Sequence, residues 1–234
     1  MPTRHLTRLD ELPWQRIETV FLDMDGTLLD LHFDNHFWQE HLPRRYARRH
    51  GLSLREARAR LAPRFAATEG TLAWYCLDHW TRDLALDIVA LKEEVAHLIA
   101  VHPHVPQFLA ALRRSGRRAV LVTNAHHGSL ALKLRRTRLD RHLDAVICAH
   151  DLKLPKEVPA FWQRLQGRLT FDPAATLLID DNLAVLQSAQ AAGIRHLLAV
   201  AAPDSRQPPR TRADFPLLAD FRLQAPLPLS DPSA

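Results

Sequence analysis

Five short apolar runs constrain the fold of this 234-residue chain more than any other feature. Each run is nearly continuous in apolar residues, which is typical of strands buried on both faces of a parallel sheet. The segments between the last four runs have apolar residues at helical spacing, so strand and helix alternate. This alternation predicts an α/β fold with a doubly wound parallel sheet. The runs cover residues 19–22, 119–122, 145–148, 176–179 and 196–200.

Residues 31–101 interrupt this alternation, because they contain no β-rich run and their apolar spacing predicts several helices. The first of these helices is expected to stop at Gly51, and Ser53 with Glu56 has the spacing of a capping box that begins the second. We therefore expect an all-α cap domain at 31–101, inserted after the first strand of a core that comprises 1–30 and 102–223. The predicted cap helices cover roughly 35–50, 53–62, 68–86 and 92–100.

Charge and cysteine patterns limit the classes of partner. The formal net charge is +5, but the basic residues are scattered as separate pairs along predicted helices, so no nucleic-acid partner is expected. The two cysteines, Cys76 and Cys148, lie in no CxxC or Cys/His metal spacing. Neither a disulfide framework nor a zinc site is therefore indicated.

The termini and the hydropathy pattern predict a cytoplasmic protein without a membrane partner. Residues 1–18 carry charges throughout, unlike a signal peptide, and no apolar run approaches the roughly 20 residues that span a bilayer. From Ala202 the chain is rich in proline, which predicts a surface segment or partial disorder that ends in a tail at 224–234. The oligomeric state stays open, because an apolar face for a partner has the same pattern as a core face.

Polar side chains follow four of the predicted strands. Because the carboxyl ends of parallel strands lie at one edge of a sheet, these side chains should converge on one crevice. Clustered carboxylates raise one another's pKa unless a cation lies among them, and an all-oxygen cluster suits Mg²⁺. Isolated aspartates are instead expected to be turn residues or helix N-caps, namely Asp30, Asp34, Asp151 and Asp172. The residues at the strand ends are Asp23, Asp25, Thr27, Thr123, Asn124, Lys153, Lys156, Asp180 and Asp181.

These motifs resemble those of the haloacid dehalogenase (HAD) superfamily, in the family's order and over about residues 19–200. The resemblance implies a parallel sheet in the order 5-4-1-2-3, with a helical C1-type cap directly after the first motif. Lys156 fits the family's lysine motif better than Lys153, because Pro159 and an aromatic pair follow it. The matching residues are Asp23-Met24-Asp25-Gly26-Thr27-Leu28, Thr123-Asn124, Lys156 and Asp180-Asp181.

Chemistry and the resemblance together imply roles for the motif residues. Asp23 is expected to attack phosphorus and form an aspartyl-phosphate. Asp25 would act as general acid on the leaving oxygen and then as general base on water. Thr123 would hold the phosphoryl oxygens, with Gly26 and Asn124 beside it, and Lys156 would stabilise their charge. The expected Mg²⁺ ligands are Asp181, Asp180, Asp23 and, through its backbone carbonyl, Asp25.

The reaction class follows from Asp25. A leaving oxygen needs an acid and a halide does not, so phosphate-ester hydrolysis is favoured over dehalogenation. Residues 29–38 and 71–80 of the cap, with His126 and the strand-end motifs, look like the 5′-nucleotidase branch that hydrolyses GMP and IMP. A phosphatase or mutase acting on a small sugar phosphate is the alternative, and a non-catalytic binding protein is a further one.

Substrate contacts in the cap are open to several assignments. Trp74 and Trp80 lie at helical spacing and are expected to belong to the cap's own core. Polar residues on other faces are better candidates for the cleft. Those that we select as substrate-binding are Asn35, Tyr75, Asp78 and His126, while His32, Asp34 and His79 are weaker candidates.

Overall fold

Within residues 6–230, which the computed structural model describes, a six-stranded sheet has the strand order β3-β2-β1-β4-β5-β6, and every neighbouring pair is parallel. The predicted order 5-4-1-2-3 is confirmed for the first five strands, and β6 extends the sheet beside β5. The central strands β1 and β4 are buried along their whole length, as their continuous apolar sequences predict. The strands are β1 (Thr19–Leu22), β2 (Arg118–Thr123), β3 (Ala145–Cys148), β4 (Thr176–Asp180), β5 (His196–Val200) and β6 (Leu217–Leu218).

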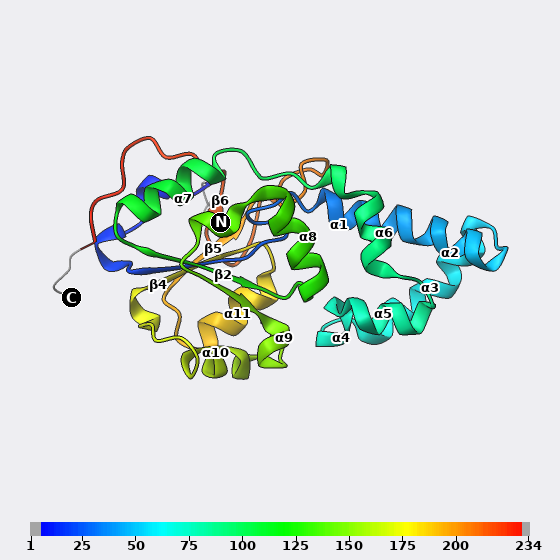
Figure 1. The fold of residues 1–234 in the computed structure, drawn as a ribbon. Coiled ribbons are helices and arrows are strands. Elements are labelled where there is room, and N and C mark those ends of the chain that lie inside the picture. The colour runs from blue at the N-terminus through cyan, green and yellow to red at the C-terminus, as the bar shows by residue number, and fades with distance from the viewer. Residues whose placement is uncertain (1–5, 231–234) are drawn as a thin grey trace.

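Helices cover both faces of the sheet (Figure 1). On one face, α7 (Val105–Arg114) and α8 (His127–Thr137) pack through Phe108 and Leu130 onto an apolar layer with β1 and β2. On the other face, Trp162 and Leu186 belong to a second buried layer. That layer is contributed by α9 (Ala149–Leu152), α10 (Pro159–Gln166) and α11 (Leu183–Ala191).

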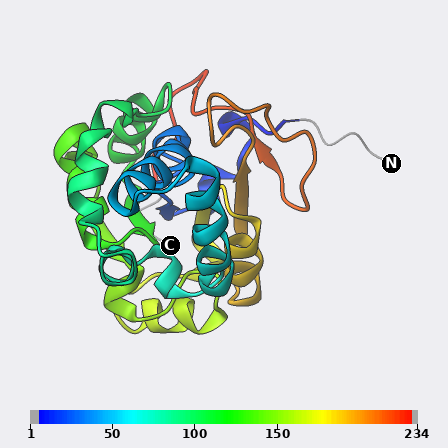
Figure 2. The ribbon, with the colours of Figure 1, turned by 90° about the vertical axis from the view of Figure 1, so that its right-hand side faces the viewer.

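The cap helices gather at one end of the sheet, to the right in Figure 1 and facing the viewer in Figure 2. They surround an apolar core of their own that includes Phe37, Leu61 and Trp80. Leu132 of α8, a helix of the core domain, also packs into this cluster. Gly51 ends α2 in the left-handed region, with φ 62°. The Ser53–Glu56 capping box is present. The cap comprises α1 (His32–His36), a π-helical turn (Phe37–His41), α2 (Leu42–His50), α3 (Leu54–Thr68), α4 (Leu72–Tyr75), α5 (Leu77–Leu84) and α6 (Ile88–Glu94).

Two predicted cap helices are wrong. The helix expected at 92–100 is instead α6 (Ile88–Glu94), followed by a separate 3₁₀ turn at Ala96–Leu98. Residues 68–86 do not form a single helix either. Helices α4 and α5 are separated at Cys76, whose backbone is extended at φ −83° and ψ 107°. The Cys76 thiol accepts a hydrogen bond from the backbone N–H of His79 at 3.4 Å and so caps α5. The break places Tyr75 and Cys76 at the end of a short helix that faces the core.

The two connections between cap and core run side by side. Leu29 and Val101 form an antiparallel bridge. On either side of it, Asp30 N–H donates to the carbonyl of Ala100 at 2.9 Å, and His102 N–H donates to Leu28 at 3.0 Å. Because the second crossing pairs with the first, both lie next to the loop that follows β1.

Most of the segment after Ala202 lies on the surface as predicted, but part of it is buried against the sheet. Phe215 and Phe221 are buried, and Leu217–Leu218 forms β6 against the edge of β5. Asp204 is also buried. Apolar residues between the prolines therefore close the sheet edge, and residues 231–234 of the predicted tail lie outside the described part of the chain. No helix within residues 6–230 is long and apolar enough to cross a bilayer.

Candidate active site

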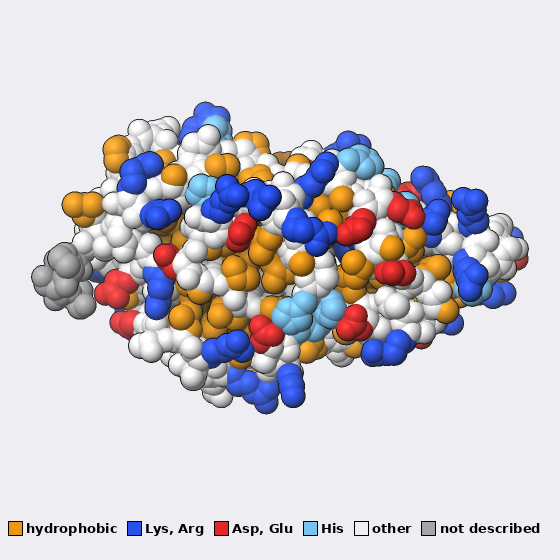
Figure 3. Space-filling model, viewed as in Figure 1, with side chains coloured by type: hydrophobic (Ala, Val, Ile, Leu, Met, Phe, Trp, Pro, Cys, Tyr) orange, Lys and Arg blue, Asp and Glu red, His pale blue; other side chains and the backbone are white. Residues whose placement is uncertain are grey.

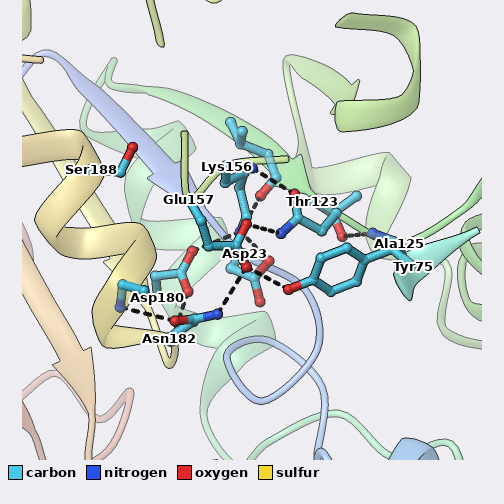
Figure 4. A network of polar contacts seen from close by, with 12 residues as sticks. Asp23, Tyr75, Thr123, Ala125, Lys156, Glu157, Asp180, Asn182 and Ser188 are labelled. Carbon is cyan, nitrogen blue, oxygen red and sulfur yellow. Dashed lines mark hydrogen bonds and ion pairs between the residues drawn. The ribbon is translucent and has the colours of Figure 1, made fainter. Parts of the chain in front are cut away.

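A buried lysine joins the carboxylates at the ends of β1 and β4 (Figure 4). The Nζ atom of Lys156 lies 2.5 Å from Oδ1 of Asp23 and 2.7 Å from Oδ2 of Asp180, and it donates to the carbonyl of Val122 at 3.0 Å. Burial disfavours its charge, but the carboxylates of Asp180 and Asp23 raise the pKa of Lys156 above its usual value. Lys153, the alternative, is exposed at a left-handed turn.

Asp23, Asp180 and Asp181 offer carboxylate oxygens that lie within 4.8 Å of one another. Burial raises the pKa of Asp23 to about 6, with Lys156 opposing it, and burial with Asp180 and Asp23 raises the pKa of Asp181 well above its ordinary value. Such a cluster favours a cation, and its all-oxygen donor set fits Mg²⁺. The residues present therefore fit the expected metal.

Of the two adjacent aspartates, Asp181 has the carboxylate with fewer hydrogen bonds and is therefore more available to a metal ion. Both oxygens of Asp180 are engaged, by Lys156 and by the N–H of Asn182 at 2.9 Å. The Asp181 carboxylate accepts no hydrogen bond from the described residues, while Arg210 donates to its backbone carbonyl. Gly26, at φ +85°, lies against this carboxylate, and a Cβ there would be 2.7 Å from Asp181 Cγ. Gly26 thus allows the loop to approach Asp181 and does not itself line the cavity.

Asp25 belongs to a second ion cluster, which sequence reasoning missed. Lys133 of α8 lies 2.6 Å from Asp25 Oδ1 and 2.7 Å from Asp34 Oδ2, and Lys92 of α6 lies 2.6 Å from Asp34 Oδ1. Both lysines are buried. Burial raises the pKa of Asp25 to about 6 even though Lys133 opposes the shift. A carboxyl group with a pKa in this range can both donate and accept a proton near neutral pH.

The expectation that Asp34 is a turn or cap residue is therefore wrong. Its carboxylate is held between Lys133 and Lys92, which lower the pKa of Asp34 to about 2 despite its burial. Asp30 and Asp172 do act as predicted, because they accept hydrogen bonds from the N–H groups of His32 and Ala174.

Replacing Asp34 with Asn should lower the free energy of unfolding by about 3–5 kcal/mol, because breaking a buried ion pair leaves a lysine charge uncompensated. Urea-induced unfolding measures the change. Asp83→Asn is the matched control: this half-exposed residue pairs with Arg64 at 3.0 Å, and its loss should cost less than about 1 kcal/mol. Equal costs for the two variants would contradict the role given to Asp34.

Glu157, which sequence reasoning also missed, connects the cap to the core. Its carboxylate accepts hydrogen bonds from the Tyr75 hydroxyl at 2.5 Å, from Asn124 Nδ2 at 2.9 Å and from Asn182 Nδ2 at 3.1 Å. Asn124 also accepts from the N–H of Lys156 at 2.9 Å. The Asn124 amide is thus engaged by the lysine loop at both ends. Its position directly after Lys156 was the one available signal for Glu157.

A cavity of about 430 Å³ lies between cap and core above these groups. Ten of the predicted site residues line it: Asp23, Asp25, Asn35, Tyr75, Thr123, Asn124, His126, Lys156, Asp180 and Asp181. Trp38 and Trp74 line its cap side, so Trp74 contributes to the cavity as well as to the cap core, whereas Trp80 is buried as predicted. Asp78 does not line it and is 67% exposed, because α5 turns this face outward after the break at Cys76.

Known proteins are similar to this chain over most of its length. A family model described as haloacid dehalogenase-like hydrolase matches residues 17–193. GMP/IMP nucleotidase YrfG of Escherichia coli strain K12 is 40% identical over 215 residues, which are 92% of this chain and 97% of that protein; the Shigella flexneri protein of the same name matches equally well.

Solved structures support the same fold. A HAD phosphatase from Thermococcus onnurineus matches with a TM-score of 0.72 at 24% identity, over 88% of this chain and 94% of that one. A putative β-phosphoglucomutase from Thermotoga maritima matches with a TM-score of 0.56 at 22% identity, over 79% and 85%. The sheet order, the strand-end residues and the family match agree, and the chain belongs to the haloacid dehalogenase-like hydrolases.

Proposed function

We propose that this hydrolase is a Mg²⁺-dependent phosphatase that converts purine nucleoside 5′-monophosphates, GMP and IMP, to nucleoside and phosphate. The observation that carries the proposal is the cavity, in which Asp23 and Asp25 lie below a cap side that contains Trp38 and Trp74. A nucleobase can stack on such aromatic rings, which contributes on the order of 1–3 kcal/mol per base. The similarity to the E. coli GMP/IMP nucleotidase supports the same substrate class.

The reaction would take place in two displacements at phosphorus. In the first, an Asp23 oxygen forms a bond to phosphorus while the bond to the 5′-oxygen breaks, and Asp25 gives its proton to that oxygen. In the second, Asp25 takes a proton from water as the water oxygen bonds to phosphorus. Phosphate leaves and the Asp23 carboxylate is restored.

Charge on the transferring group is balanced by fixed residues. Lys156 is held beside Asp23 by its bonds to Asp180 and Val122, so its positive charge lies next to the attacking oxygen. Thr123 lines the cavity, and its Oγ1 accepts from Ala125 N–H at 3.0 Å, which leaves the hydroxyl proton free to donate to a phosphoryl oxygen. A Mg²⁺ ion held by Asp23, Asp180 and Asp181, with the Asp25 backbone carbonyl, would neutralise phosphoryl charge.

The cap would close over the bound nucleotide and exclude bulk water. The Tyr75–Glu157 hydrogen bond spans the boundary at the cavity and favours the closed arrangement. The paired linkers at Leu29 and Val101 are the places about which the cap can turn. Substrate-free and substrate-bound structures with one identical, open cap position would contradict this movement.

Tyr75→Phe should raise the KM for GMP at least about tenfold with little change in folding, because a hydrogen bond to a charged group contributes about 1.5–3 kcal/mol. Steady-state kinetics measures the change. Tyr46→Phe is the matched control, since it removes the chain's other phenol hydroxyl from the buried interior of the cap. An unchanged KM in Tyr75→Phe would show that this contact does not favour substrate binding.

A panel of phosphorylated metabolites tests the substrate. We expect kcat/KM for GMP and IMP to exceed that for phosphoglycolate and a hexose phosphate by about 10²-fold, because a site that binds the base loses those contacts with a sugar phosphate. EDTA should abolish turnover and added Mg²⁺ should restore it. Faster turnover of the sugar phosphates would overturn the nucleotidase proposal and leave a phosphatase of different specificity.

A further inference from the structure

A sulfur and two imidazoles meet at the boundary of cap and core, next to the cavity. Cys76 comes from the break between α4 and α5, His126 caps α8, and His150 lies on α9. One potential ligand atom from each lies within 4.8 Å of the others. Figure 3 shows histidine side chains gathered on this face with carboxylates on both sides. Because the three residues are 24 or more positions apart, no metal-binding spacing exists in the sequence.

His150 is oriented as a metal-binding histidine would be. Its Nε2 atom is buried and has no hydrogen-bond partner among the described residues. A neutral imidazole carries a lone pair on one ring nitrogen, which is the form that binds a metal ion. Burial, with the neighbouring His126 and His127, lowers the pKa of His150 to about 4, so this lone pair is available at neutral pH. An unpartnered buried nitrogen costs free energy unless something binds it.

The Cys76 and His126 side chains make only long, weak polar contacts that metal binding would replace. The Cys76 sulfur accepts one long hydrogen bond, and it is partly exposed to solvent. His126 accepts from the N–H of Gly128 at 3.3 Å, and its Nε2 atom lies 3.5 Å from Asp78. Both are long contacts that a metal–nitrogen bond would outweigh.

We propose that Cys76, His126 and His150 bind a borderline transition-metal ion such as Zn²⁺ and thereby join the cap to the core. Thiolate and imidazole ligands select such ions over Mg²⁺. With metal–nitrogen distances of about 2.0–2.1 Å and a metal–sulfur distance of about 2.3 Å, tetrahedral ligand atoms lie roughly 3.3–3.6 Å apart. Since the ligand atoms lie within 4.8 Å of one another, their separations need to shrink by at most roughly 1.2–1.5 Å, which side-chain rotation can supply. Water or the exposed Asp78 carboxylate, which lies 3.5 Å from His126 Nε2, would complete the coordination.

The three proposed ligands come from both the cap and the core. Cys76 is adjacent to Tyr75, and His126 lines the catalytic cavity. A metal bound to both would hold the cap against the core beside the Tyr75–Glu157 contact. This site is separate from the carboxylate cluster at Asp23, and the proposal does not depend on the phosphatase activity.

Titration of the full-length protein with Co²⁺ tests the proposal. We expect saturable binding of one ion at this site, with the charge-transfer absorption that a cobalt–thiolate bond produces. Cys76→Ser should remove that absorption and weaken binding at least about tenfold, and His150→Asn should weaken it similarly. Circular dichroism confirms that the variants are folded.

Two controls locate the ion. Cys148→Ser keeps the hydrogen bond to the Ala125 carbonyl and lies outside the cluster, so it should retain the absorption. Asp181→Asn should retain it too, since that change affects only the carboxylate cluster. An absent thiolate absorption in the unaltered chain, or one that persists in Cys76→Ser, would overturn the proposal. The cobalt–thiolate absorption is measured without substrate, so a chain that fails to hydrolyse GMP would still show whether this metal site exists.

Hydrogen exchange tests the joining of cap and core. Zn²⁺ should slow amide exchange across α4 and the linkers at Leu29 and Val101 in the unaltered chain, because binding to the closed form opposes local opening. The same addition should leave exchange in Cys76→Ser unchanged. Equal protection of both proteins would place the ion elsewhere and refute the proposed link.

Discussion

Asp23→Asn should reduce the Mg²⁺-dependent hydrolysis of GMP by at least about 10⁴-fold, the scale of loss seen when a nucleophile is removed. An amide cannot form the bond to phosphorus that the Asp23 carboxylate provides. The change keeps the shape of the side chain, and Lys156 keeps its contacts with Asp180 and Val122. Initial rates at saturating GMP measure the loss, and thermal unfolding shows that the variant is folded.

Trapping the aspartyl-phosphate distinguishes the loss of the nucleophile from a defect in substrate binding or folding. Acid quenching of the unaltered protein with phosphate-labelled GMP should leave label on the chain, and Asp23→Asn should carry none. Asp172→Asn is the matched control, because this exposed aspartate caps the N–H of Ala174, a role that asparagine fills equally well. Substantial turnover by Asp23→Asn would contradict a covalent mechanism.

Much of the fold was predictable because its signals are local. Continuous apolar runs located the strands of the sheet, and parallel topology then brought Asp23, Thr123, Lys156 and Asp181 to one edge. Strand β6 is two residues long and lies among prolines, so no periodicity could indicate it. Its stability comes from the edge of β5, which is a tertiary contact.

The cap was harder to predict because its chemistry depends on long-range pairing. Trp74, Leu77 and Trp80 keep helical spacing across the break at Cys76, so periodicity alone predicted one helix. Lys92 and Lys133 are each on a helix with apolar neighbours, a pattern that also suits an exposed lysine. Only the fold reveals that Asp34 compensates both charges.

Asp25→Asn should lower kcat for GMP by about 10²–10⁴-fold, the usual contribution of general acid–base catalysis. The nucleoside 5′-oxygen is a poor leaving group and needs the Asp25 proton. A nitrophenolate leaves without one, so the first displacement on 4-nitrophenyl phosphate should be far less affected. The second displacement still needs a base to deprotonate water, whichever substrate formed the aspartyl-phosphate.

This asymmetry gives the variant a kinetic signature that mere misfolding would not. With 4-nitrophenyl phosphate, Asp25→Asn should release close to one nitrophenolate per folded chain in a rapid burst, followed by slow turnover. The stalled chains should carry phosphate on Asp23, and the double variant with Asp23→Asn should show no burst. A burst-free Asp25→Asn that slows both substrates equally would instead indicate that Asp25 serves mainly to hold Lys133 and Asp34 in place.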